Sequence, residues 1–362
     1  MYIYMSSQTQ PSSKSKYAGH PDYILNPKTG RWVKKTGTIG QKLLAEPAQP
    51  RAQPRAQPRA QPRVQPQQVE KPKIPLKIKP PAKIPISIKP DKPQKVSTQI
   101  PLKTNVVITI TMGDVAENHV GMQKIGELAK EGFSIADLTN AKKQFEARGC
   151  QCELIDLNQA LPSGTVAEPA AVLIARQGVN YIDPEIPDLA DQMLAEQIDL
   201  KWDTKAKMYG KVVNKKARYN LTYDDVAQEP NYDAGKGRIV AFSEIPFTHL
   251  VRESLPQLLG PKAKDLVAEG NKYYDVKTCG ISFHGDSERK KVVAVRLGAS
   301  MPLHYQWFIK NKPVGERIKL MINHGDIYIM SEKATGFDWK SSSKYTLRHA
   351  AGCQKYLTIK EK

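Results

Sequence analysis

Two copies of the tripeptide His-Gly-Asp, at 284–286 and 324–326, are the residues of this sequence best suited to chemistry. In a strand, residues i and i+2 point to the same face, so the histidine and aspartate of either copy could hold one metal ion. An iron(II) site with two histidines and one carboxylate needs a second histidine from a later strand, and it leaves positions open for oxygen and an organic cosubstrate. Polar residues of a turn are the alternative for each copy.

The two copies differ in the second histidine available to them. His349 follows Asp286 by 63 residues, with about four expected strands between them, so a later strand of a two-sheet fold can bring it back. It follows Asp326 by only 23 residues, with one expected strand between them. We therefore predict His284, Asp286 and His349 as metal ligands and 324–326 as a corner between strands. Satisfied structural polar residues remain the alternative for the first copy.

The surroundings of His284 resemble the AlkB-like family of iron(II)- and 2-oxoglutarate-dependent dioxygenases. In "NKYYDVKTCGISFHGDSE", residues matching the family pattern are Asn271, Tyr273, His284, Asp286 and Glu288. "AVRLGAS" and "GDIYIMSEKATGFDWK" resemble later parts of the family, so the resemblance covers about residues 205–360. It implies a double-stranded β-helix (jelly roll), the cofactors Fe(II), 2-oxoglutarate and O2, and oxidative demethylation of alkylated bases with release of formaldehyde.

The family's closing pattern R-x-N-x-T-x-R has an incomplete counterpart in "CQKYLTIK", where Thr358 and Lys360 fit its end and Gln354 replaces its first arginine. The distal carboxylate of 2-oxoglutarate needs a buried cation. Lys360, on the strand expected at 355–360, is the first candidate, and a solvated lysine is the alternative reading of it. Arg296 is the second candidate, because a guanidinium can grip a carboxylate with two bonds.

Aromatic and basic residues near the motif are candidates for contacts with a flipped base. The predicted substrate-binding residues are Tyr274, Glu288, Trp339, Arg348, Arg218 and Tyr219. The last two belong to "KVVNKKARYNLTYDD", which the resemblance suggests is part of a lid over the core. Each aromatic residue could equally be core packing, and for Trp307 in "HYQWFI" a core position is favoured.

Positive charge is concentrated at the N-terminus. The chain has a formal charge of +19, of which +16 lies in residues 1–104 and +3 in the remaining 258 residues. The repeat "AQPRAQPRAQPRAQPRVQPQQ" and the Lys-, Pro- and Ile-rich stretch after it cannot bury a core, so residues 1–22 and 45–104 are predicted to be disordered. This tail could contact nucleic-acid phosphates, or it could be a solubilising spacer.

The segment 23–44, "YILNPKTGRWVKKTGTIGQKLL", has turn signals at Asn26-Pro27 and Thr29-Gly30 and is expected to be ordered. It resembles a short adaptor segment of proteins from large cytoplasmic DNA viruses. The two cysteines usual in that segment are absent, and Trp32 follows the arginine. The resemblance implies a viral source and docking to a viral or host protein.

The remaining sequence predicts an α+β protein with two domains. A strand at 105–113, two helical stretches around Gly132 and two further strands predict a small α/β domain at 105–185. A helical acidic connector follows, and many short strands then predict the jelly-roll dioxygenase at 200–362, with "KYLTIK" as its last strand.

Several classes of protein are disfavoured. No run of about 20 apolar residues and no secretory signal is present, and the four cysteines are too scattered for a disulfide framework or a zinc site. We expect an intracellular protein of the host cytoplasm or nucleus, which could also be packaged in the virion. Alternatives to base demethylation are hydroxylation of a protein or small molecule by the same iron centre, and a non-catalytic virion or scaffold protein with a nucleic-acid-binding tail.

Overall fold

The computed structural model describes residues 23–26, 31–36, 41 and 104–359. The chain divides into two compact units, residues 1–92 and 93–362. In the first unit, β1 (Tyr23–Asn26) and β2 (Arg31–Lys34) form an antiparallel pair. The predictions of disorder concern residues that lie, almost all of them, outside the described ranges. None of the helices in the described part of the chain is long and apolar enough to cross a membrane.

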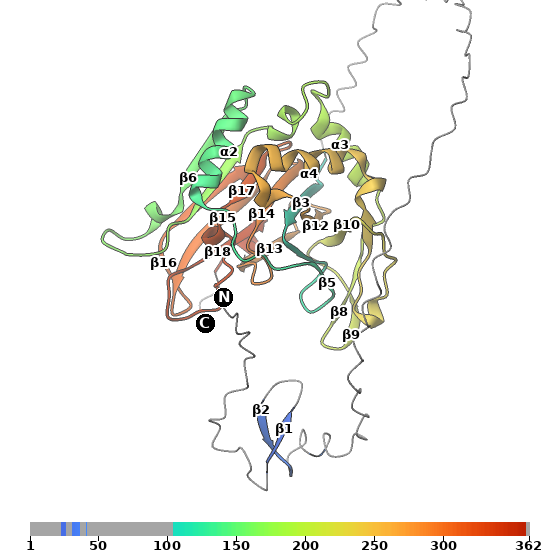
Figure 1. The fold of residues 1–362 in the computed structure, drawn as a ribbon, viewed down its shortest axis with the longest axis vertical. Helices are drawn as coiled ribbons and strands as arrows, with labels where there is room; N and C mark the ends of the chain where they lie inside the picture. The colour runs from blue at the N-terminus through green and yellow to red at the C-terminus, as the bar shows by residue number, and fades with distance from the viewer. Residues whose placement is uncertain (1–22, 27–30, 37–40, 42–103, 360–362) are drawn as a thin grey trace, which may run out of the picture. The chain divides into compact units, whose positions relative to one another are not determined.

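The second unit is a mixed α+β structure built on two main sheets (Figure 1). The eight-stranded sheet runs in the order β11 (Ile239–Ala241), β10 (Tyr219–Asp224), β12 (Val267–Tyr273), β3 (Val107–Gly113), β14 (Val292–Gly298), β17 (Ile327–Met330), β7 (Ala171–Ala175) and β6 (Cys152–Asp156). The four-stranded sheet runs in the order β13 (Gly280–His284), β18 (Thr346–Gly352), β15 (Met301–Ile309) and β16 (Lys312–Ile322). Two separate hairpins are β4 (Val115–Glu117) with β5 (Lys124–Gly126) and β8 (Lys205–Met208) with β9 (Lys211–Asn214).

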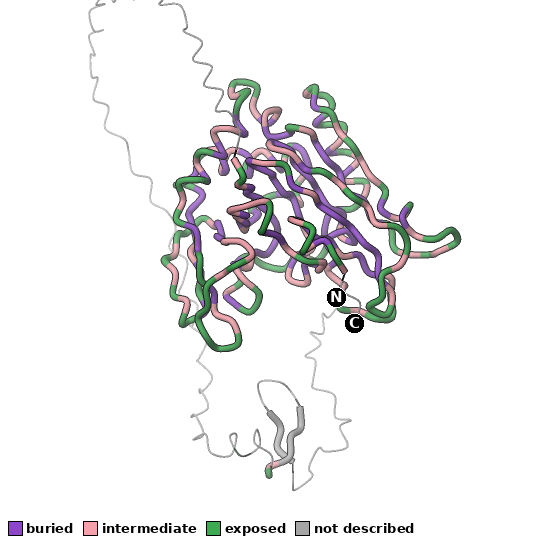
Figure 2. Tube along the Cα trace, turned by 180° about the vertical axis from the view of Figure 1, so that it is seen from behind, coloured by how far each residue is buried: buried purple, intermediate pink, exposed green. Residues whose placement is uncertain are grey.

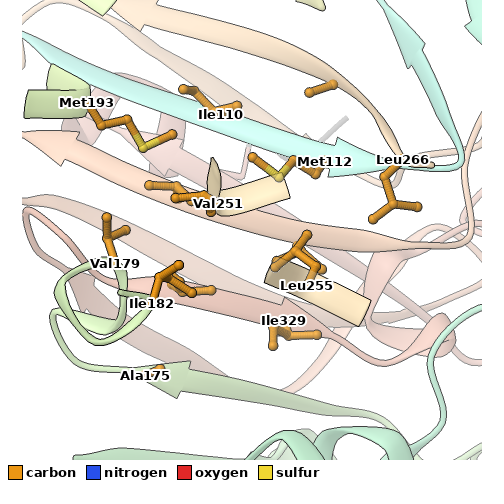
Figure 3. Close-up of a cluster of buried hydrophobic side chains, with 14 of the residues drawn as sticks. Ile110, Met112, Ala175, Val179, Ile182, Met193, Val251, Leu255, Leu266 and Ile329 are labelled. Carbon is orange, nitrogen blue, oxygen red and sulfur yellow. The ribbon is translucent and has the colours of Figure 1, made fainter. Parts of the chain in front are cut away.

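Helices cover one face of the eight-stranded sheet. They are α2 (Ile135–Ala147), α3 (Leu189–Ile198) and α4 (Pro246–Leu259). Helix α2 begins where the Ser134 and Asp137 side chains bond reciprocally to each other's backbone N–H, which satisfies two donors at the helix start. Figure 3 shows the apolar cluster that results, with Ile110 and Met112 of β3 near Val251 and Leu255 of α4.

A second apolar cluster fills the space between the two sheets. It contains Val292 and Tyr328 from the larger sheet and Leu303, Trp307 and Leu347 from the smaller one. Trp307 is fully buried and its Nε1 donates to the Leu157 carbonyl at 2.8 Å, so the predicted core position is confirmed. The buried strands at the centre of the unit are visible in Figure 2. Because side chains alternate along a strand, the central strands β3, β14, β17 and β7 supply one set of side chains to the helices and another to this second cluster.

Short helices complete the unit. They are α5 (Glu332–Thr335), α6 (Gln354–Leu357) and the 3-10 helices η1 (Leu157–Ala160), η2 (Gly178–Tyr181), η3 (Tyr232–Ala234), η4 (Phe242–Glu244) and η5 (Pro261–Ala263). The strands from 105–185 and those from 200–362 share the eight-stranded sheet, in which β3 lies between β12 and β14.

Two predictions of secondary structure are wrong. Of the two helical stretches expected around Gly132, the first is instead the hairpin β4–β5. Gly121 and Gly126 have φ of 88° and 78°, and the carboxylate of Asp114 accepts from the Ala129 N–H. The segment therefore forms turns and not the expected helix. The strand expected at 355–360 is wrong too, because α6 covers residues 355–357 and residues 358 and 359 belong to no strand.

Candidate metal centre

The three predicted metal ligands lie together. His284 ends β13 and His349 lies directly opposite it in β18, while Asp286 follows two residues after His284. The Nε2 atoms of His284 and His349 are 3.5 Å and 3.6 Å from Oδ1 of Asp286. One ligand atom from each residue lies within 4.8 Å of the others, a spacing at which all three could bind a single ion.

The loop that carries Asp286 is held by backbone contacts. The backbone N–H of Asp286 donates to the Thr335 carbonyl at 2.9 Å, which ties the loop to the end of α5. Gly285 has no room for a side chain, because a Cβ there would lie 2.7 Å from the Cβ of Trp339. Nδ1 of His284 donates to the Ser282 carbonyl at 2.8 Å, which leaves Nε2 as the free acceptor that a metal requires.

Burial sets the protonation of the ligands. It lowers the pKa of His349 well below its usual value, helped by His284 and Arg289, so the imidazole is neutral at physiological pH. Burial raises the pKa of Asp286, and Arg289 and His284 oppose that shift. Metal ligands must be neutral imidazoles and an ionised carboxylate, so a bound ion would favour the ionised form of Asp286 and oppose the effect of burial on its pKa.

The second His-Gly-Asp is the predicted corner between strands. Nδ1 of His324 accepts the Gly298 N–H at 3.0 Å, so it is engaged in a backbone contact. The buried Asp326 carboxylate accepts from Arg176 Nη1 at 2.8 Å, from the Gln177 N–H at 2.9 Å and from the Asn323 N–H at 2.8 Å. These bonds join β7 to the β16–β17 turn.

We expect Asp326→Ala to destabilise the protein by about 3 kcal/mol, since it leaves two backbone donors without their acceptor and removes the buried partner of Arg176. Glu153→Ala is the matched control, because it removes the exposed partner of the same Arg176 and should cost less than about 1 kcal/mol. Urea denaturation measures both. Equal losses for the two variants would contradict the role given to Asp326.

A chain of buried polar groups leads away from His284, Asp286 and His349, which we call the triad. Arg289 Nη2 donates to Glu269 and, at 2.9 Å, to Glu288, while Nε lies 3.9 Å from Asp286 Oδ2. Asn271 donates to Glu269 at 3.0 Å and accepts from Arg218 Nε at 2.6 Å. The predicted residues Glu288, Asn271 and Arg218 therefore connect with the triad. Arg289 and Glu269 were not predicted, although the i, i+2 spacing of 269, 271 and 273 in one strand indicates a shared face.

The other predicted substrate-binding residues form two groups. Tyr219 and Tyr274 stack with ring centroids 4.8 Å apart, and the Tyr274 hydroxyl donates to the Lys216 carbonyl at 2.6 Å. Arg348 packs over Trp339, at 5.1 Å from the ring centroid. Arg348 alternates with His349 along β18, so it faces the opposite side of the sheet from the triad. Trp339 contacts Gly285 in the loop that carries Asp286, which we call the metal loop.

The interior between the sheets contains an unusual cation. Arg296, on β14, is 1% exposed, and its Nε and Nη1 have no hydrogen-bond partner among the described residues. Thr109 lies opposite it on β3, and its buried Oγ1 is also without a partner in the described ranges. Burial raises the pKa of the nearby Tyr328 to about 12, and Arg296 opposes that shift.

Two further hydroxyls belong to this interior. Tyr305 is fully buried 5.9 Å from the His349 ring, between centroids, and its hydroxyl has no partner among the described residues. Tyr273 belongs to the same buried cluster. Of the candidates at the C-terminus, Lys360 lies outside the described residues. Thr358 is exposed and donates to the Gln354 carbonyl at 2.9 Å, so its hydroxyl caps α6 locally.

The lowered pKa of Lys215, which lies near Arg218 and Glu269, leads us to predict that stability depends on pH. Burial lowers the pKa of its amine to about 7, and Nζ donates to Asn118 Oδ1 at 2.8 Å. A lysine in an unfolded chain titrates near ~10.4, so between these values the folded state binds fewer protons and stability rises with pH. We expect the melting temperature of Lys215→Met, measured relative to that of wild type, to increase as pH falls from 9 to 6, because only wild type contains the lysine whose pKa is lowered. A difference that does not change with pH would contradict the shift, and Lys216→Met is the exposed control.

The sequence is related to that of a viral protein. No protein-family model matches the chain. The chain is 49% identical over 253 residues to an uncharacterized protein of Acanthamoeba polyphaga mimivirus, a match that covers 69% of this chain and 97% of the viral protein. Identity of this level over nearly the whole relative means that the chain belongs to the same family as this mimivirus protein.

Proposed function

We propose that the protein is an iron(II)- and 2-oxoglutarate-dependent dioxygenase. The observation that carries the proposal is the convergence of His284, Asp286 and His349 on one point, with both Nε2 atoms within 3.6 Å of the same carboxylate oxygen. Two neutral imidazoles and one carboxylate are the ligand set of the non-haem iron(II) oxygenases, and they leave coordination positions open. The resemblance of the surrounding motifs to AlkB-like enzymes supports the same reaction class.

The cosubstrate site that fits this centre is the interior around Arg296. Nε and Nη1 of the buried Arg296 guanidinium have no hydrogen-bond partner among the described residues, which is costly, and a carboxylate that accepts these N–H groups would offset the cost. The Thr109 hydroxyl, opposite Arg296 on β3, and the buried Tyr305 hydroxyl also have no partner among the described residues, so both could donate to a bound cosubstrate. In this account Arg296 binds the distal carboxylate of 2-oxoglutarate, in place of the arginine missing from the C-terminal motif.

The finer fold that we propose is a jelly roll with an unusual strand order. From β12 to β18 the chain passes repeatedly between the two sheets and contributes seven strands. A jelly roll has eight strands. We assign the eighth place to β3, which lies between β12 and β14 and precedes the other seven in sequence. This assignment explains why the C-terminal segment forms α6 and not a last strand.

In this account, each residue has a defined task. His284, Asp286 and His349 hold iron(II), Arg296 fixes the cosubstrate, and the apolar cluster between the sheets excludes water. When bound, iron(II) with 2-oxoglutarate and O2 supplies the oxidising power that hydroxylates a C–H bond, while the cosubstrate becomes succinate and carbon dioxide.

For the substrate, we propose an alkylated base in nucleic acid. The hairpin β8–β9 carries Lys205, Lys207 and Lys211, and the fully exposed Tyr209 lies at its turn. The chain continues from this hairpin to Arg218, which is bonded to Asn271 beside the metal centre. Cations and an exposed aromatic ring suit a phosphate backbone and a stacked base. Hydroxylation of a protein or small molecule remains the competing proposal.

The proposal is tested by anaerobic titration of iron(II) and 2-oxoglutarate into the full chain. We expect the visible charge-transfer band of the ternary complex, and succinate formation once oxygen is admitted. Neither signal would appear for a non-catalytic scaffold. Formaldehyde released from methylated oligonucleotides, and not from methylated peptides, would support nucleic acid as the substrate.

A further inference from the structure

Arg289 lies at the centre of a cluster of carboxylates. It is 2% exposed and follows the metal loop directly. Its Nη2 donates to Glu269 of β12 and to Glu288, and its Nε is 3.9 Å from Asp286 Oδ2. The guanidinium thereby joins the metal loop to a strand of the larger sheet. Its Nε and Nη1 have no hydrogen-bond partner within the described ranges, so the side chain retains donors for a further acceptor.

The two oxygens of Asp286 face different groups. Oδ1 lies 3.5 Å and 3.6 Å from the two histidine Nε2 atoms, on the side where an ion would bind. Oδ2 is the oxygen nearest to Arg289. Electrostatic attraction to a fixed guanidinium holds Oδ2 away from the ion, because rotation of the carboxylate toward chelation would weaken that attraction.

We infer that Arg289 is a positioning residue that limits Asp286 to one metal-facing oxygen. This inference rests on the proposed iron function. A carboxylate can bind a metal through one oxygen or through both, and chelation through both occupies an additional coordination position. The proposed reaction requires open positions for 2-oxoglutarate and O2. Arg289 thus keeps a position open without contacting the ion.

The charge of the cluster indicates the direction of the effect on ion affinity. Asp286, Glu269 and Glu288 with one Arg289 carry a net charge of −2 when all are ionised, which complements a divalent cation. Removing the guanidinium increases the negative charge beside the ion and frees Oδ2 to chelate it. Arg289 variants should therefore bind a divalent ion at least as tightly as wild type, but with fewer open positions.

The test uses Mn(II) and the full chain. Electron paramagnetic resonance in 17O-enriched water counts the water molecules on bound Mn(II), and a titration gives its affinity. We expect Arg289→Met to carry one fewer water than wild type, with Mn(II) affinity no weaker and 2-oxoglutarate affinity about 10-fold lower. Glu288→Gln is the matched control, since it alters a neighbour of Arg289 but leaves the contact with Asp286, and its water count should equal that of wild type.

A second variant guards against a failure to fold. Arg289→Met leaves Glu269 buried without its cation, so the double variant Glu269→Gln, Arg289→Met removes that uncompensated charge and should give the same water count. An unchanged water count in both variants, or weaker Mn(II) binding, would overturn the inference while wild type still binds Mn(II). Failure of wild type to bind Mn(II) would instead remove the proposed function itself.

Discussion

Replacing His349 by alanine is expected to lower iron(II) affinity by more than about 100-fold while the protein stays folded. The variant removes one of three ligands, and the remaining His284 and Asp286 come from a single loop. Its effect on folding should be small, because Nδ1 of the His349 ring has no hydrogen-bond partner among the described residues. Isothermal titration calorimetry with iron(II) under anaerobic conditions measures the affinity, and circular dichroism monitors the fold.

His324→Ala is the matched control for this variant. It removes the histidine of the second His-Gly-Asp, whose Nδ1 bonds to the Gly298 N–H and not to other candidate ligands. Iron(II) affinity of this variant should equal that of wild type. If His324→Ala weakened the affinity as much as His349→Ala, the assignment of the first motif as the metal centre would fail.

Arg296→Met is expected to lower 2-oxoglutarate affinity by roughly 100-fold without changing iron(II) affinity. Two hydrogen bonds from a guanidinium to a carboxylate are worth about 3 kcal/mol or more together, and methionine fills a similar space without any donor. Titration of 2-oxoglutarate into the iron(II) protein, followed by the charge-transfer band, gives the affinity.

For Arg296→Met we also predict that thermal stability is not lost, in contrast to the loss of 2-oxoglutarate affinity. In the absence of 2-oxoglutarate, Arg296→Met should melt at or above the temperature of wild type, because it removes a buried cation whose Nε and Nη1 have no hydrogen-bond partner among the described residues. Arg317→Met is the matched control: that half-buried guanidinium packs over Phe283, 5.1 Å from the ring centroid, and donates to the Leu357 carbonyl. Unchanged cosubstrate affinity in Arg296→Met would contradict the proposed site.

The sequence predicted that His284, Asp286 and His349 lie together, because this geometry depends on simple rules. Alternation along a strand places His284 and Asp286 together, and the number of strands to His349 distinguishes the first motif from the second. The same count of strands predicted a corner at Asp326. In the structure, the Asp326 carboxylate accepts from one side-chain donor and two backbone donors.

The C-terminal strand could not be predicted correctly from local residues. "KYLTIK" has the β-branched and aromatic residues of a strand, but a strand also needs a free position in a sheet. In the proposed jelly roll that position is filled by β3, from more than 200 residues earlier in the chain, and this pairing is not visible in local sequence. Lys360 was accordingly the first candidate for the cosubstrate anchor, whereas Arg296 is a buried cation between the two sheets.

Arg289 was missed for a related reason. In the sequence it stands in "DSERKK", a polar run typical of an exposed turn. Its burial depends on Glu269, which β12 places beside the loop. Long-range pairing of this kind decides whether a charged residue is solvated or part of a site.

X-ray absorption spectroscopy at the iron edge of the anaerobic, iron(II)-loaded protein tests the central claim most directly. We expect one ion per chain, with first-shell scattering from nitrogen and oxygen only and the multiple scattering of two imidazoles, which His284→Ala reduces to one. A sulfur shell, an ion without imidazole scattering, or no bound iron would contradict a centre built from His284, Asp286 and His349.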